Sequence, residues 1–198
     1  DYLIKEKIVD FKDKMVLLVC GMDRFGMAES LEKSGCDLVL GDLIFALGVP
    51  IPIRSLKTLN VLASIIAPIV CRLPFEVLYP TGQKQEKKSS SKFGRFYDAA
   101  DIIAGDFLFI KQHLPEDISG KIILTNTVTA DDVALLRERG AKMLITTTPN
   151  LNGRSFGTNV MEGVLVSLSP KPYKSLTPDD YNALLDKIGF APRIEILN

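Results

Sequence analysis

The sequence predicts an α/β fold: a doubly wound, Rossmann-like, mainly parallel sheet of five or six strands. Short apolar runs alternate with segments of helical periodicity along the chain, which is typical of strand–helix–strand units around a parallel sheet. The first run, residues 15–20 (MVLLVC), is almost wholly apolar, as expected for a strand covered on both faces. With 198 residues, the chain can bury a core that needs no disulfide or metal to hold it.

Later apolar runs predict the remaining strands of this sheet. Residues 69–73 fit either a strand or an apolar loop, and the sequence leaves both open. The expected strands cover residues 15–20, 37–40, 101–104, 121–124 and 142–146.

Helices are predicted by periodicity and by their start and stop residues. The first ends at Gly35, a usual C-cap. Two later helices carry start signals, because Thr129 precedes Asp132 by three residues and Thr177 is followed by Pro178. The expected helices cover residues 26–34, 55–67, 130–139, 158–168 and 178–188, with a lead-in helix at 4–11.

These elements suggest three parts. Residues 1–12 are expected to form a lead-in helix from a preceding domain, since the first residue is Asp rather than Met. Residues 13–170 are the expected dinucleotide-binding domain, and residues 171–198 a C-terminal helix and tail that pack on it. Residues 82–95 hold five basic residues and one acid, which predicts a surface loop or, alternatively, a basic flap over an anionic ligand.

Composition excludes several classes of function. Lys plus Arg and Asp plus Glu are both 24, whereas binders of nucleic acid or anionic membranes usually carry a basic excess. No apolar run is long enough to span a bilayer. Three widely spaced cysteines without a Cys-x-x-Cys pair indicate a reducing, cytoplasmic setting. The chain has one histidine, which cannot form a His-based metal cluster by itself, so no metal site is expected.

The first strand runs into a turn that resembles a dinucleotide-binding fingerprint. Gly21 and Gly26 bracket the turn, a helix follows, and Asp42 comes 21 residues after Gly21, where an acid would bind the ribose and favour NAD over NADP. Asp23 replaces the middle glycine and would repel a pyrophosphate. Either Arg24 offsets that charge, or the ligand is not a dinucleotide and Asp23 caps the helix.

Polar residues also end the later strands, at the sheet edge where ligands bind in such folds. Asp106 follows a glycine, as Asp42 does, and both could instead cap helices. Asn126, Thr127 and Thr146 are expected near the nicotinamide or the substrate.

Residues 153–159 (GRSFGTN) precede another helix. Glycines, hydroxyls and an arginine before a helix N-terminus favour an anion, so Arg154, Ser155, Thr158 and Asn159 are predicted to bind a substrate or anion. The alternative is an elaborate turn. The candidate catalytic residues are Asp106, Asn126 and Arg154.

Four segments, residues 23–28, 41–48, 78–82 and 153–162, resemble a bacterial family labelled quinate or shikimate dehydrogenase-like. The likeness runs from about residue 10 onward. Residues 100–149 are similar to the second half of a nicotinamide-binding domain, with a short helix after "ADII". In shikimate-type dehydrogenases a Lys–Asp pair for proton transfer lies mainly in an N-terminal domain. No matching lysine motif is seen here, so that catalytic pair does not carry over.

The sequence and the resemblance together predict the cofactor-binding portion of an NAD- or NADP-dependent oxidoreductase acting on a small hydroxylated acid such as quinate or shikimate. The cofactor would supply the hydride chemistry. One alternative is a non-catalytic domain that binds a small anion or metabolite at residues 153–159. Another is a structural or oligomerisation domain. A small molecule is the expected partner, and self-association is left open.

Overall fold

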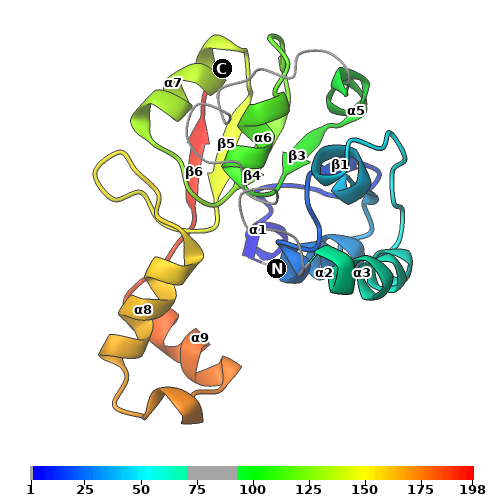
Figure 1. Cartoon of the computed structure of the whole chain (residues 1–198). Helices are drawn as coiled ribbons and strands as arrows, with labels where there is room; N and C mark the ends of the chain where they lie inside the picture. The colour runs from blue at the N-terminus through cyan, green and yellow to red at the C-terminus, as the bar shows by residue number, and fades with distance from the viewer. Residues whose placement is uncertain (1, 71–92) are drawn as a thin grey trace.

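The computed structural model describes residues 2–70 and 93–198, which fold around a six-stranded sheet (Figure 1). The strand order is β2-β1-β3-β4-β5-β6. Neighbours among β1 to β5 pair in parallel, and β6 pairs antiparallel with β5. The predicted α/β class and mainly parallel sheet are therefore confirmed. The strands are β1 (Met15–Leu18), β2 (Asp37–Leu40), β3 (Ile102–Ala104), β4 (Ile122–Thr125), β5 (Met143–Thr146) and β6 (Arg193–Ile196).

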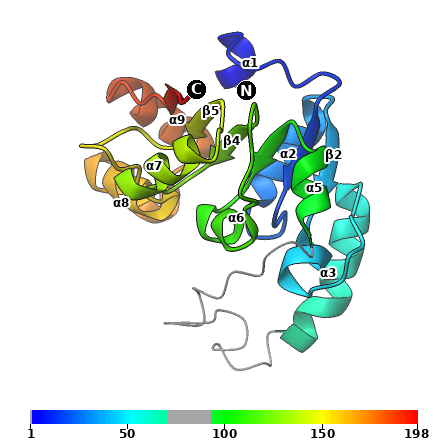
Figure 2. The ribbon, with the colours of Figure 1, turned by 90° about the horizontal axis from the view of Figure 1, so that it is seen from above.

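Alternate residues of the strands supply two hydrophobic cores, one on each face of the sheet. In β1, Leu17 belongs to one core, whereas Val16 and Leu18 belong to the other. In Figure 2, α1 and α6 lie on opposite sides of β4. Burial on both faces explains the continuous apolar runs of these strands. Helices α5 (Gly94–Ala99), α6 (Phe107–His113) and α7 (Ala130–Glu138) supply the first core, and α2 (Phe25–Lys33) and α3 (Leu56–Val70) the second.

The predicted helix caps are confirmed. Thr129 at α7 and Thr177 at α9 (Pro178–Lys187) each form a capping box with an aspartate three residues on. Gly35, just after α2, has a φ of 77°, which L-residues with a side chain rarely adopt. The sequence therefore determines these helix ends locally.

The N-terminal segment differs from the expected helix over residues 4–11. Helix α1 covers only Tyr2–Lys5, and Lys7 takes a left-handed φ of 54° that breaks the helix. Val9 and Phe11 are buried in the second core, so the apolar spacing that suggested a helix reflects burial of an irregular segment.

Other differences lie between β2 and β3 and at the C-terminus. Residues 69 and 70 end α3, whereas residues 71–73, 78–82 and most of 82–95 lie outside the described residues. Strand β6 was not predicted, and it places the tail at the sheet edge. Between β5 and β6, α8 (Thr158–Leu168) and α9 form a helical hairpin that extends away from the sheet (Figure 1), with a 3-10 turn, η3 (Tyr173–Ser175), between them.

The strand order places a reversal beside β1. The chain passes from β1 to β2 on one side and then crosses to β3 on the other side of β1. In open α/β sheets such a reversal leaves a crevice at the carboxyl ends of the two flanking strands, and ligands bind there. This edge of the sheet carries the residues discussed next.

Candidate ligand-binding site

A cavity of about 470 Å³ lies beside the carboxyl ends of the strands. Its walls come from segments far apart in the sequence: the N-terminal segment, α2 from its first turn to its C-cap, the ends of β4 and β5, and the first residue of α8. Most of the wall is apolar, with a small number of polar groups, as is usual for small-molecule sites. The lining residues are Leu3, Ile4, Phe11, Asp23, Arg24, Phe25, Gly26, Met27, Ser30, Leu31, Ser34, Leu124, Asn126, Thr147 and Thr158.

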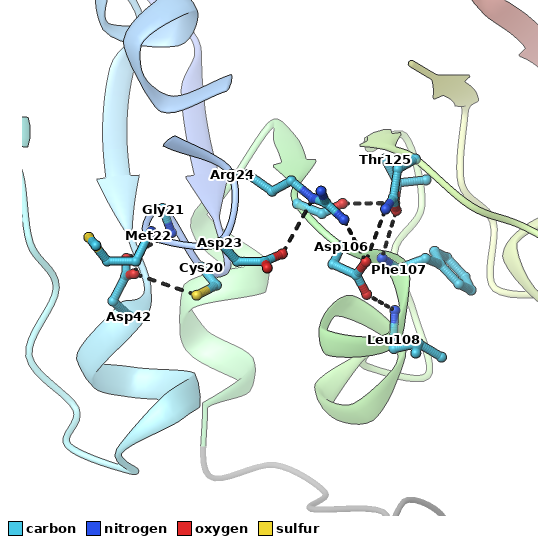
Figure 3. A network of polar contacts seen from close by, with 12 residues as sticks. Cys20, Gly21, Met22, Asp23, Arg24, Asp42, Asp106, Phe107, Leu108 and Thr125 are labelled. Carbon is cyan, nitrogen blue, oxygen red and sulfur yellow. Dashed lines mark hydrogen bonds and ion pairs between the residues drawn. The ribbon is translucent and has the colours of Figure 1, made fainter. Parts of the chain in front are cut away.

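Arg24 joins the cavity to a polar network between β1, β3 and β4 (Figure 3). Its Nη2 donates to Asp106 Oδ2 at 2.9 Å, and Asn126 Nδ2 donates to the same oxygen at 3.0 Å. The other oxygen of Asp106 accepts from the Leu108 amide at 2.9 Å and so caps α6. Asp106 thus both caps a helix and orients Arg24 and Asn126 along the cavity wall.

Two buried polar atoms in the cavity wall have no hydrogen-bond partner among the described residues. They are Arg24 Nε and Thr147 Oγ1. Arg24 Nε lies 3.4 Å from Asp23 Oδ2, an ion-pair distance without hydrogen-bond geometry. A buried donor without an acceptor costs about 1–3 kcal/mol, so each of these two atoms lowers the stability of the fold.

The first turns of two helices meet the same cavity. Neither α2 nor α8 has a side-chain cap, and neither has an acidic residue in its first turn. Gly26 and Thr158 from these turns line the cavity. The amides at a helix N-terminus carry partial positive charge that attracts anions. The alternative that Asp23 caps α2 is not seen, since α2 has no side-chain cap.

Asp42 lies outside the cavity lining, behind the turn that follows β1. Its two carboxylate oxygens accept from the Gly21 and Met22 amides, both at 2.9 Å. Asp42 is only 9% exposed and begins a single π-helical turn, η1 (Asp42–Ala46). A Cβ on Gly21 would lie 3.0 Å from Leu40 and Leu59 atoms and 3.2 Å from the Asp42 carboxylate. The turn therefore encloses Asp42 as an internal anion.

The loop over residues 147–157 is held by hydrogen bonds of Thr146, Thr148 and Ser155. Ser155 is buried, its hydroxyl lies 2.9 Å from that of Thr146, and its backbone pairs with Val128. Thr148 Oγ1 donates to the Phe156 carbonyl at 2.6 Å. Arg154 is exposed and lies outside the cavity lining. The loop therefore agrees with the alternative that residues 153–159 form an elaborate turn rather than an anion site. Thr158, just after the loop, does reach the cavity.

The structure thus divides the predicted site residues into three groups. The cavity wall contains Asp23, Arg24, Gly26, Asn126 and Thr158, with Asp106 bonded behind it. The buried residues held by internal bonds are Gly21, Asp42, Thr146 and Ser155. The exposed residues outside the cavity lining are Thr127, Arg154 and Asn159.

Thr147 is one of the cavity-lining residues that were not predicted from the sequence. It lies within a run of three threonines after β5. Thr146 and Thr148 hydrogen-bond to the protein, whereas the hydroxyl between them does not. Side-chain alternation at the end of an extended segment was the signal that could have separated Thr147 from its neighbours.

Two titratable groups near this edge are packed into the protein. Burial, followed by the charge of Asp42, raises the pKa of the Cys20 thiol to about 12, so this cysteine is a poor nucleophile. His113 is partly buried, with its ring 5.3 Å from Phe45 and 5.9 Å from Phe93. Burial lowers the pKa of His113. Neither group lines the cavity.

Within residues 2–70 and 93–198, no three His, Cys, Asp or Glu side chains are grouped so that they could hold a metal ion. None of the helices described there has the length and apolar character needed to cross a membrane.

Comparison with known proteins identifies the family without giving a function. No curated protein matches the chain, and no solved structure matches it. One family model covers almost the whole chain, residues 1–197. The chain belongs to this family, which is described as a domain of unknown function, DUF8754.

Proposed function

We propose that this chain binds a small hydroxylated acid in the 470 Å³ cavity. The ligand's acid group would face the first turns of α2 and α8, beside Arg24. One observation carries the proposal: the Arg24 side chain and the uncapped first turns of α2 and α8 line one cavity. An anionic oxygen accepts from such donors more strongly than a neutral one does.

The charges around the cavity restrict the ligand to one strongly anionic group. Asp23 lines the wall and Asp106 lies directly behind it. Their carboxylates repel a second anion but accept hydrogen bonds from hydroxyl groups. The cavity volume lies within the range of about 300–1,000 Å³ that small-molecule sites occupy. A hydroxylated monocarboxylate satisfies these conditions, in agreement with the resemblance to quinate or shikimate dehydrogenase-like proteins.

The second candidate is an NAD- or NADP-dependent oxidoreductase built on a doubly wound, Rossmann-like domain. The reversal of strand order beside β1, with the uncapped α2 directly after it, favours this candidate. Asp42 does not fit the role of ribose ligand, because its carboxylate is buried outside the cavity lining, where it accepts the Gly21 and Met22 amides. We therefore derive no catalytic step through a nicotinamide cofactor.

Calorimetry separates the two candidates. We would titrate the chain separately with quinate, shikimate, inorganic phosphate, NAD and NADP. The proposal predicts saturable binding of a hydroxylated acid, with affinity reduced at least about tenfold in Arg24→Met, as expected when a charged hydrogen bond is lost. The matched control is Arg54→Met, because Arg54 also bonds an aspartate at 2.9 Å but lies on the surface.

Each outcome of the calorimetry has a definite meaning. Binding of an acid to the chain and to Arg54→Met, with loss in Arg24→Met, supports the proposal. Equal affinity in all three proteins refutes the Arg24 contact. Binding of NAD or NADP without binding of any acid favours the second candidate.

A further inference from the structure

The cavity continues along one face of α2, beyond the first turn that faces the proposed acid group. Met27, Ser30, Leu31 and Ser34 line it at helix positions i, i+3, i+4 and i+7, which lie on one side of a helix. Ser34 is the C-cap of α2. At the rise of an α-helix, the distance along its axis from Gly26 to Ser34 is about 12 Å. The cavity is therefore longer than an acid group alone requires.

The wall beyond the first turn of α2 is mainly apolar, and it comes from α2, from β4 and from the N-terminal segment. Phe11, Leu31 and Leu124 are buried members of the second core, and Leu3 and Met27 pack against that core. Ile4 completes this part of the wall and is 46% exposed. We call these six residues the apolar part of the cavity: Leu3, Ile4, Phe11, Met27, Leu31 and Leu124.

The charged side chains of the cavity wall lie at one end only. Among the lining residues, Asp23 and Arg24 carry charge, and both directly precede α2. The two serines further along add no charge: Ser34 Oγ donates to the Leu31 carbonyl at 2.6 Å, and Ser30 is exposed to solvent. A ligand with its acid group beside Arg24 would thus place the rest of its length against apolar wall.

The volume of the cavity exceeds what a single ring acid needs. An apolar cavity of about 150 Å³ holds a benzene molecule, whereas this cavity measures about 470 Å³. A ring acid such as quinate or shikimate, held by its acid group beside Arg24, would leave apolar wall in contact with water. Each methylene group that covers such wall adds favourable free energy through the hydrophobic effect.

We propose that the ligand is a hydroxylated monocarboxylate with an aliphatic chain, and that the chain lies along α2 in the apolar part of the cavity. This inference rests on the proposed function for the acid end and adds the chain to it. An extended chain advances about 1.2 Å per bond, so a length of about 12 Å accommodates roughly ten bonds. Because α2, β4 and the N-terminal segment all line this part, it encloses the chain of a small molecule rather than the flat face of a protein.

NMR titration of the full chain with a series of α-hydroxy acids tests this proposal. The series is α-hydroxybutanoate, α-hydroxyhexanoate, α-hydroxyoctanoate and α-hydroxydecanoate, and we expect affinity to rise about three- to fourfold for each added methylene until the cavity is filled. Vicinal octanediol, in which a terminal hydroxymethyl group replaces the carboxylate of α-hydroxyoctanoate, is the probe without an acid.

One variant and one matched control locate the chain. Ile4→Gln places a polar side chain in the apolar part of the cavity, and Ile4 is exposed enough for the fold to tolerate it. The control is Ile65→Gln on α3, which also replaces an exposed isoleucine (62% exposed) but lies outside the cavity lining. Thermal melts verify that both variants fold.

The expected result is that Ile4→Gln binds α-hydroxyoctanoate at least about threefold more weakly than wild type and Ile65→Gln do, while all three bind α-hydroxybutanoate equally. Equal affinity for every acid of the series overturns the chain site and leaves the acid site of the proposed function intact. Vicinal octanediol that binds as tightly as α-hydroxyoctanoate supports the chain site but refutes the acid contact, and with it the proposed function. If no member of the series binds, both proposals are wrong.

Discussion

At the scale of single residues, the placement of Asp42 determines what the turn after β1 can bind. A carboxylate that accepts the Gly21 and Met22 amides occupies donors that an external anion would otherwise take. The Asp42 carboxylate is thus a permanent internal ligand of this turn. The donors that remain for a ligand lie further along, at the first turn of α2 and at Arg24.

Asp42→Asn tests this structural role. An asparagine amide group can accept with only one atom, so one buried backbone amide loses its acceptor, and we expect the free energy of unfolding to fall by about 1–3 kcal/mol. Urea unfolding measures the change. The control, Asp37→Asn, alters an exposed ion pair with Arg54, which contributes at most about 1 kcal/mol. Equal stability of wild type and Asp42→Asn would contradict the role assigned to Asp42.

Substitutions at Thr147 and Thr148 should distinguish an effect on ligand binding from an effect on stability. Thr147→Val removes a buried hydroxyl that bonds nothing in the protein, so stability should rise, by up to about 1–3 kcal/mol, while affinity for a hydroxylated acid falls about five- to tenfold. Thr148→Val removes the hydroxyl bonded to the Phe156 carbonyl and should destabilise the chain by about 1–3 kcal/mol. Calorimetry and urea unfolding on both variants measure the two effects. If Thr147→Val binds the acid as wild type does, Thr147 makes no ligand contact.

The burial of His113 leads to a prediction of how the stability of the chain depends on pH. Burial lowers its pKa below the ordinary value of 6.5, so the unfolded chain takes up a proton at pH values where the folded chain does not. Its contribution to stability is therefore complete above pH 6.5 and is lost as the pH falls, by at most about 1.4 kcal/mol per pH unit. His113→Phe, which keeps an aromatic ring beside Phe45, should show a flatter profile. Parallel pH profiles in urea unfolding would contradict this prediction.

At the scale of elements, most helices and strands are determined by local sequence. The apolar runs identified β1 to β5, and the capping boxes identified the starts of α7 and α9. Strand β6 was missed because four residues (RIEI) with two exposed isoleucines resemble a polar tail, and only pairing with β5 makes them a strand. The helix predicted over residues 4–11 was longer than α1, because the tertiary burial of Val9 and Phe11 produced a helix-like spacing of apolar residues.

The capping box of α7 gives a prediction at this scale. Burial raises the pKa of Asp132, but hydrogen bonds from Lys111 and from the backbone and side chain of Thr129 more than offset this and lower it. Thr129→Ala removes the cap and one of these bonds, so the free energy of unfolding should fall by about 1 kcal/mol. Thermal unfolding at pH 7 measures the loss. An unchanged melting temperature would show that α7 does not depend on its cap.

At the scale of the whole molecule, the strand order brings the site together. The sequence predicted polar residues at the strand ends, and Asp23, Arg24, Gly26, Asn126 and Thr158 do share one cavity. The internal bonding of Asp42 could not be predicted, because it depends on the path of the turn between β1 and α2. The part of the cavity wall that the N-terminal segment forms could not be predicted either, because Leu3 and Ile4 reach the cavity only through the tertiary fold.

The central claim is that this cavity binds a hydroxylated monocarboxylate, and amide chemical-shift mapping by NMR tests it most directly. On titration with quinate or shikimate, we expect the largest shifts at the amides of Gly26, Thr147 and Thr158, which line the cavity. The amides of Gly21 and Met22, already bonded to Asp42, should shift little. Absence of saturable shifts, or shifts centred on Gly21 and Met22 instead, would contradict the claim.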